Sequence, residues 1–188
     1  MAILPIITLP DPLLRKVSEP VERVDAEVRR LLDDMLETMY EAPGIGLAAI
    51  QVAVPKRIVV IDVGKTEETR APLFLINPEI VWVSEELSVY QEGCLSVPDY
   101  FEDVKRPAQA RVRHLDRDGA LQEFDAEGLL ATVVQHELDH LEGGLFIDHL
   151  SRLKRERVVK KFNKAARFDE IAARRRGAAE RQSETAGA

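Results

Sequence analysis

The sequence predicts an α+β fold in which antiparallel strands surround a central helix, with an amphipathic helix before the strands and a basic helix at the C-terminal end. Two observations predict it. Apolar patterns occur in the order helix, strands, helix, and two of the strand-like segments are joined by a short turn. An alternation of strands and helices would instead predict a parallel sheet. A chain of 188 residues can bury one hydrophobic core, and we expect one globular domain.

The first helix is predicted to begin after Asp25, whose carboxylate suits the N-cap position. The pair Pro43-Gly44 ends the helical pattern. Between these limits the apolar side chains recur at helical spacing, which predicts an amphipathic helix. They are Val28, Leu31, Leu32, Met35, Leu36, Met39 and Tyr40.

Short segments rich in β-branched residues follow this helix and are predicted to be strands. The last two flank Asp118-Gly119, a dipeptide that favours a tight turn, so they are predicted to form a β-hairpin. The predicted strands are Arg57 to Val63, Leu73 to Ser84, Leu87 to Tyr90, Arg111 to Asp116 and Ala120 to Phe124.

The central helix is predicted to begin at Gly128 and to end at Gly143-Gly144. One face carries Leu129, Val133, His136 and His140, so its two histidines continue an inward-facing apolar stripe.

A further helix is predicted to begin near Leu150, with Leu153, Val158, Phe162 and Ala165 spaced among many basic residues. We expect the last dozen or so residues to be disordered, because their composition is polar and small. The predicted domains are therefore a folded domain in residues 1–165 and a basic helical extension with a disordered tail in 166–188.

Composition narrows the class of protein. The apolar N-terminus is interrupted by Pro5, Pro10 and Pro12 and has no basic flank, so it resembles neither a signal peptide nor a membrane span. The single cysteine, Cys94, allows no internal disulfide and suits a reducing cytosol. We therefore expect a cytoplasmic protein that binds no membrane and no DNA.

Charge is unevenly distributed along the chain. Residues 151–188 hold 12 Lys/Arg against 5 Asp/Glu, and residues 1–150 hold 14 Lys/Arg against 28 Asp/Glu.

The central helix contains the pattern His136-Glu137-Leu138-Asp139-His140. Two imidazoles four residues apart lie on one helical face and can reach one metal ion, and Glu137 beside a ligand can reach water at that metal. The alternative is a core helix whose histidines are held by ordinary hydrogen bonds. The full pattern within an apolar stripe favours a metal-binding helix.

A catalytic site of this kind typically has three protein ligands and one open position. The metzincin proteases place a third histidine six residues after the second, where this chain has Phe146. Glu156 lies in a basic segment whose neighbours look solvent-facing, so it is a poor candidate. Cys94 remains, since a thiolate is a strong ligand for a divalent transition metal. Taken alone, a lone cysteine is more often a small core residue.

Three motifs resemble the signatures of the peptide deformylases, and they occur in that family's order. They are Gly44-Ile45-Gly46-Leu47-Ala48-Ala49-Ile50-Gln51, Glu92-Gly93-Cys94-Leu95-Ser96, and the His136 to His140 pattern. The resemblance covers roughly residues 3 to 165. It implies a metal-dependent hydrolase that removes the N-formyl group from the initiator methionine of nascent polypeptides.

The resemblance also implies site residues. Cys94, His136 and His140 would be metal ligands, Glu137 the general acid/base, and Gln51 with the Leu95 backbone N–H the oxyanion donors. A primary amide after the small residues Ala48 and Ala49 is a suitable neutral donor, although Gln51 could instead stabilise a turn.

Substrate contacts are expected at two places. Gly44, Ile45, Gly46 and Gly93 would let an extended peptide lie against the main chain, although the first glycines could simply form a turn after Pro43. Leu129 and Val133, on the His136 face, are expected among the walls of an apolar pocket for the methionine side chain.

The family uses ferrous iron in the cell, and the donor set of one thiolate and two imidazoles also accepts Zn2+, Ni2+ or Co2+.

Many bacterial members carry an arginine seven residues after the motif cysteine, where this chain has Phe101. The resemblance implies that Asp139, which shares the helix turn with both histidines, pairs with Arg106 rather than binding metal. The basic segment from Arg152 to about Arg176 is expected to contact the ribosome, whose RNA phosphates attract Lys and Arg. Packing of its apolar positions onto the acidic body would have the same composition.

Two rival functions share parts of this sequence pattern. A metal-dependent endopeptidase of the His-Glu-x-x-His type needs the helix but has no need of the other two motifs. A structural metal site needs a fourth protein ligand, for which only His114 and His149 are candidates.

Overall fold

The computed structural model describes residues 2–64 and 66–168. The chain divides into two compact units, Met1–Leu150 and Ser151–Ala188. The predicted division of the chain near residue 165 stays a prediction, and the predicted disordered tail lies outside the described residues. In the part of the chain that the structure describes, no helix has both the length and the apolar character needed to cross a membrane.

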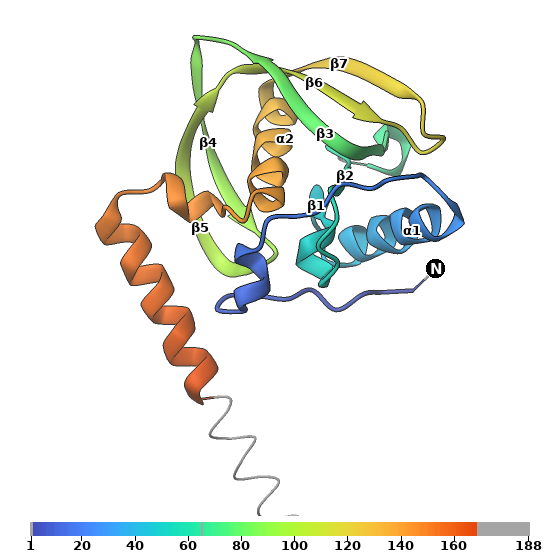
Figure 1. The fold of residues 1–188 in the computed structure, drawn as a ribbon. Coiled ribbons are helices and arrows are strands. Elements are labelled where there is room, and N and C mark those ends of the chain that lie inside the picture. The colour runs from blue at the N-terminus through green and yellow to red at the C-terminus, as the bar shows by residue number, and fades with distance from the viewer. Residues whose placement is uncertain (1, 65, 169–188) are drawn as a thin grey trace, which may run out of the picture. The chain divides into compact units, whose positions relative to one another are not determined.

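The first unit has the predicted α+β architecture, with every paired strand antiparallel to its neighbours. A five-stranded sheet has the order β1-β2-β3-β6-β7, and β4 and β5 form a separate two-stranded sheet. Helix α2 runs through the middle of this unit between the two sheets, and α1 lies beside β1 and β2 (Figure 1). The bounds are α1 Ala26–Glu41, β1 Gly46–Ala48, β2 Ile58–Ile61, β3 Leu73–Val83, β4 Leu87–Cys94, β5 Val97–Pro107, β6 Gln109–Leu115, β7 Leu121–Glu127 and α2 Gly128–Leu141, with short 3-10 turns at Pro12–Arg15, Ala49–Val52, Glu67–Thr69 and Phe146–His149.

Most predicted elements are confirmed. Asp25 caps α1, because its carboxylate accepts hydrogen bonds from the backbone N–H groups of Glu27 and Val28. The predicted hairpin is β6–β7, and Gly119 in its turn has φ 82°, a conformation that favours glycine. Helix α2 ends before Gly143, which also has positive φ.

Two strands of the structure were not expected. Strand β1 lies within the glycine-rich motif, and β5 fills residues that the sequence pattern left unassigned. In β5 the positions alternate between two environments, but the inward positions include the charged Arg106 as well as Val104. A period of two is therefore present in burial but not in hydrophobicity, and hydrophobicity is what reveals strands in a sequence.

The sheet has hydrophobic cores on both faces. Along β2, Val59 and Ile61 belong to the core that packs on α2, whereas Ile58 and Val60 belong to the core that packs on α1. This follows from the alternation of side chains along a strand. Helix α2 is thus fixed from several sides, which positions the side chains it carries.

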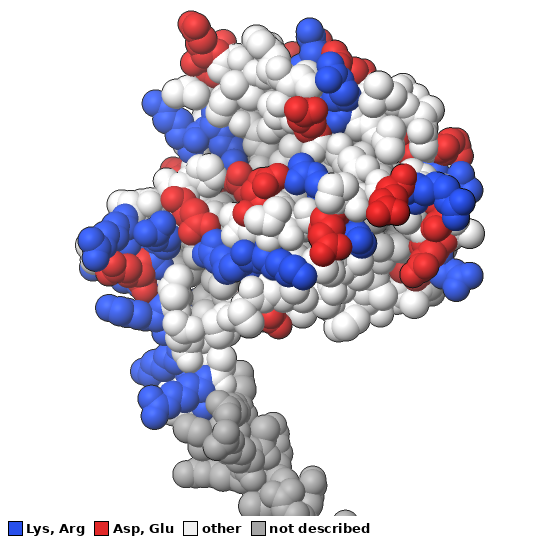
Figure 2. Space-filling model, viewed as in Figure 1, with Lys and Arg blue, Asp and Glu red and all other residues white. Residues whose placement is uncertain are grey.

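Charge is distributed differently in the two units. Residues 152–168 of the second unit are helical, as predicted, and Lys and Arg predominate on them. Figure 2 shows basic side chains gathered there, whereas acidic and basic side chains mix on the visible face of the first unit.

Candidate active site

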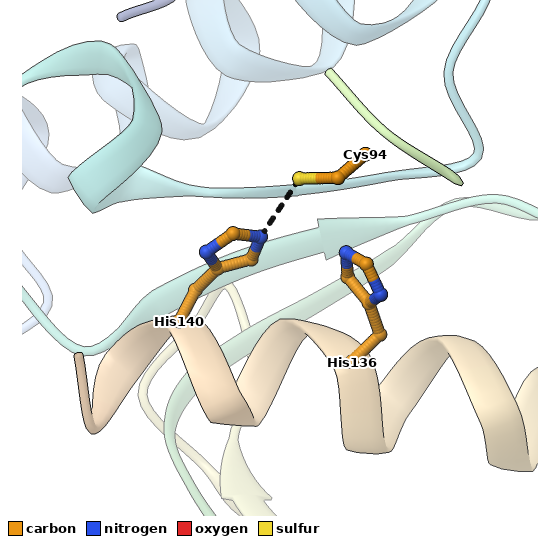
Figure 3. Close-up of side chains that lie close together, drawn as sticks. All are labelled: Cys94, His136 and His140. Carbon is orange, nitrogen blue, oxygen red and sulfur yellow. Dashed lines mark hydrogen bonds between the residues drawn. The ribbon is translucent and has the colours of Figure 1, made fainter. Parts of the chain in front are cut away.

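Three possible metal ligands converge between β4 and α2. The Sγ atom of Cys94 and ring nitrogens of His136 and His140 all lie within 4.8 Å of one another. Cys94 is the last residue of β4, and both histidines come from one face of α2 (Figure 3). The Cys94 sulfur lies 3.2 Å from Nε2 of His140. The structure therefore brings together the three residues that the sequence analysis selected.

Local geometry explains this convergence. Residues four apart on a helix lie one turn apart on the same side, and the rings of His136 and His140 have centroids 5.1 Å apart. Phe146 stacks on the ring of His136, with ring centroids 5.8 Å apart. The position that would hold a third histidine in a metzincin thus packs against one of the two imidazoles.

Glu92 holds His136 in place, a role that the sequence analysis missed. The Nδ1 atom of His136 lies 2.8 Å from Oε2 of Glu92, which leaves Nε2 for a ligand. Arg106 in turn donates two hydrogen bonds to the Glu92 carboxylate, of 2.6 and 3.0 Å. A signal was available, because Glu92 is two residues before Cys94 and therefore on the same face of the strand.

The predicted pairing of Asp139 with Arg106 is confirmed, at 2.9 Å between Oδ2 and the guanidinium. His149 also lies 2.7 Å from the same Asp139 oxygen. Hydrogen bonds from His136 and Arg106 outweigh the effect of burial and lower the pKa of Glu92 below its ordinary value. We call the four residues that these contacts link the rear network: Glu92, Arg106, Asp139 and His149.

Glu137 has the opposite environment. It is buried, and among the described residues its Oε2 atom has no hydrogen-bond partner. Burial raises the pKa of Glu137 from 4.5 to about 7. A Cβ added at Gly46 would lie 2.3 Å from Oε1 of Glu137, so only glycine lets the β1 backbone pass this close to the carboxylate. The first and third motifs therefore meet at Glu137.

Gln51 connects the first motif to the second. Its side-chain oxygen accepts a hydrogen bond of 2.8 Å from the backbone N–H of Ala48. Its amide nitrogen is thereby turned toward Ser96 Oγ, 3.1 Å away, and toward Cys94 Sγ, 3.6 Å away. The side chain is almost completely buried, so the orientation of this amide is fixed beside the three converging ligand atoms.

The remaining candidates lie around this cluster. A Cβ on Gly44 would lie 2.9 Å from Cδ1 of Leu95, which puts the start of the first motif against the second. Val133 is buried beside Gly46, whereas Leu129 and Ile45 are 37% and 40% exposed. Gly93 pairs with Phe101 across the β4–β5 sheet.

The pKa values of the two imidazoles are shifted in opposite directions. Burial opposes a charge on His136, but hydrogen bonds with Cys94 and Glu92 raise its pKa well above the ordinary value. Burial and the neighbouring His136 lower the pKa of His140 well below it. Because metal ligation needs neutral imidazoles, binding of an ion would release a proton from His136.

No fourth ligand joins the cluster within residues 2–64 and 66–168. The Nδ1 atom of His114 lies 3.0 Å from the backbone oxygen of Leu115, and His149 belongs to the rear network. The structural-metal rival needs four closed protein positions, and these residues provide three. Three possible ligands with a buried carboxylate alongside match the donor count of a catalytic metal centre rather than that of a structural one.

The fold and the site thus define a class of protein, the metal-dependent hydrolases in which one helix carries a His-Glu-x-x-His pattern. The family model described as polypeptide deformylase matches residues 3–156. The chain belongs to this family, whose members are hydrolases that remove the N-formyl group from formyl-Met nascent peptides. The alternative of an endopeptidase of the His-Glu-x-x-His type is not supported.

Similar proteins agree with this assignment. The chain is 65% identical over 167 residues to a peptide deformylase of Mesorhizobium japonicum, covering 89% of this chain and 95% of that one. A relative from Rhizobium meliloti is 62% identical, with 89% and 96% covered. A crystal structure of peptide deformylase from Ehrlichia chaffeensis superimposes with a TM-score of 0.83 at 44% identity, covering 89% of this chain and 99% of that one.

Proposed function

We propose that Cys94, His136 and His140 hold one divalent metal ion, ferrous in the cell, and that Glu137 is the general acid/base of formyl-group removal. The observation that carries this proposal is the unpartnered buried carboxylate oxygen of Glu137 beside three convergent ligand atoms. A buried carboxylate left without a partner is costly, so its retention suggests a chemical role.

The residues fit a divalent transition metal. One thiolate and two imidazoles form a donor set suited to Fe2+, Zn2+, Ni2+ or Co2+. The Glu92 contact fixes which nitrogen of His136 is free, as partners of metal-bound histidines commonly do. When bound, the ion would supply Lewis acidity that polarises the formyl carbonyl and activates water.

The chain's own residues would then perform two tasks, proton transfer and stabilisation of the oxyanion. Glu137, with its pKa near 7, accepts a proton from the attacking water and delivers it to the departing amine. The C–N bond of the formamide breaks, releasing formate and a free α-amino group. The Gln51 amide and the Leu95 backbone N–H donate hydrogen bonds to the oxyanion that forms in between.

Substrate binding is assigned to the segments that border the cluster. Strands β1 and β4 are each at the edge of their sheet, so Gly44, Ile45, Gly46 and Gly93 can pair with an extended peptide. Leu129 and Val133 supply apolar surface for the methionine side chain. An isoleucine-first formyl peptide cleaved as fast as a methionine-first one would refute this pocket.

The decisive experiment is an assay of anaerobically purified protein, with elemental analysis of the bound metal, on formyl-Met-Ala and on a casein-type substrate. We expect cleavage of the formyl peptide alone, loss of activity with a chelator, and its return with Fe2+. Cys94→Ser should lose metal more than it loses stability, because a hydroxyl is a far poorer ligand than a thiolate. Unchanged metal content in that variant would remove Cys94 from the site.

We also propose that the basic helix at residues 152–168, and the segment up to about Arg176, contacts the ribosome in the cytoplasm. Support comes from its charge, since Glu156 is the one acidic residue among many Lys and Arg in the described part. The test is co-sedimentation with ribosomes at low and high salt. A form truncated after Leu150 that is active on short peptides and binds ribosomes equally well would contradict it.

A further inference from the structure

An aromatic ring lies exposed on the β4–β5 sheet beside the site. Phe101 is 65% exposed and pairs with Gly93, the residue before Cys94. A Cβ on Gly93 would lie 2.4 and 2.6 Å from Cε1 and Cδ1 of the Phe101 ring. The ring therefore lies directly over Gly93 and occupies the space that a side chain at that position would fill.

The two faces of this sheet have different roles. Side chains alternate along a strand, and directly opposed residues of an antiparallel pair share a face. Glu92, Cys94 and Arg106 share the inner face, which carries the metal-ligand cluster and its support. Gly93 and Phe101 share the outer face. The Phe101 ring thus lies over the residue that precedes Cys94, but on the opposite face of the sheet from the Cys94 side chain.

Strand β4 has a free edge at this point, since β5 is its one strand partner in the described chain. Under the proposed function, an extended substrate pairs along that edge with its formyl carbon beside Cys94 and its methionine side chain directed inward. The next substrate residue then points to the outer face, because side chains of an extended peptide alternate.

We propose that Phe101 determines specificity for the substrate residue that follows the formylated methionine, and that it favours an apolar side chain there. Phe101 on β5, Gly93 on β4 and that residue of the extended substrate would lie on three adjacent strands, each about 4.8 Å from the next. Because Gly93 has no side chain, nothing separates the ring from the substrate. The ring offers apolar contact and no countercharge, so a charged residue gains nothing from it.

The first test uses the wild-type enzyme and formyl-Met-X-Ala peptides in which X is Gly, Leu, Phe or Asp. The expected result is a higher kcat/KM for Leu and Phe than for Gly or Asp, by about fourfold for each methylene group removed from water. Equal values for all four peptides would overturn the inference. Failure to cleave any of them would instead overturn the proposed function on which it rests.

The second test compares Phe101→Ser and Phe101→Leu with Val89→Ser. Val89 is a matched control, because it is 59% exposed on the same outer face of β4 but further from Cys94. Phe101→Ser should lose the preference for Leu and Phe through KM while leaving the X = Gly peptide unchanged. Phe101→Leu should retain most of the preference, and Val89→Ser all of it.

Two outcomes would contradict the assignment. An equal loss on all peptides in Phe101→Ser would show a structural role for the ring. An unchanged preference in that variant would show that the ring does not meet the substrate. If Phe101→Ser does not fold, the wild-type series still decides, because equal kcat/KM values for the four peptides overturn the inference.

Discussion

The two buried glutamates near His136 lie in opposite environments. Glu92 accepts hydrogen bonds from Arg106 and contacts His136, and these contacts keep the pKa of Glu92 low. Glu137, in contrast, has one carboxylate oxygen without a partner among the described residues, and burial raises the pKa of Glu137 to about 7. Identical side chains therefore have pKa values shifted in opposite directions by what surrounds them, and the proposed function assigns support to Glu92 and proton transfer to Glu137.

The substitution Glu137→Gln tests the proposed difference between the two glutamates most directly. We expect kcat/KM on formyl-Met-Ala to fall by about 10²- to 10⁴-fold, because the amide cannot accept and deliver the proton. Metal content should not change. Elemental analysis of the same sample checks that, and Glu127→Gln, an exposed glutamate at the other end of α2, is the control. Near-full activity with metal bound would refute the role of Glu137.

Removal of the rear carboxylate should act on stability instead. Glu92→Ala leaves the buried Arg106 without its main partner and should lower the free energy of unfolding by about 3–5 kcal/mol. Metal affinity should fall by about 10- to 100-fold, since His136 loses the group that orients it. Urea denaturation and metal titration measure the two effects. A stable variant with unchanged metal affinity would contradict the supporting role.

The pH dependence of stability sharpens the contrast. In chelator-treated protein the folded pKa of Glu137, about 7, exceeds its ordinary value of 4.5, so protonation favours the fold. This contribution is complete below pH 4.5 and is lost as pH rises through 7. Glu137→Gln, neutral throughout, should therefore exceed the wild type in stability by about 3 kcal/mol at pH 9.

Below pH 4.5 the two proteins should converge. Denaturation curves across this range are the measurement. A difference that is constant with pH would mean that Glu137 does not titrate as its environment indicates.

The smallest effect is expected at the exposed end of the rear network. The Asp139 side chain is 28% exposed, and Arg106 keeps its bonds to Glu92 if Asp139 is replaced. Asp139→Asn should cost about 1 kcal/mol of unfolding free energy, as partly solvated ion pairs do, and should leave turnover within about twofold. A collapse of activity would mean that Asp139 contributes directly to the chemistry.

Much of this protein follows from its amino-acid sequence alone. Helical periodicity after Asp25 and from Gly128 predicts α1 and α2, because a buried helix face must be apolar at fixed intervals. The spacing of His136 and His140 puts both rings on one face for the same reason. The three motifs indicate the family, and they select Cys94 as the third candidate ligand, which lies beside the two histidines in the fold.

The partners of those residues depend on how the chain packs in three dimensions. Strand β5 escapes prediction because Arg106 occupies an inward position that a sequence pattern expects to be apolar. Its burial is possible because Glu92, from another strand, neutralises it. Likewise, the fit of Gly46 against Glu137 joins residues far apart in the chain. Periodicity records which face of an element is buried, whereas the identity of the group that meets it depends on how the elements pack.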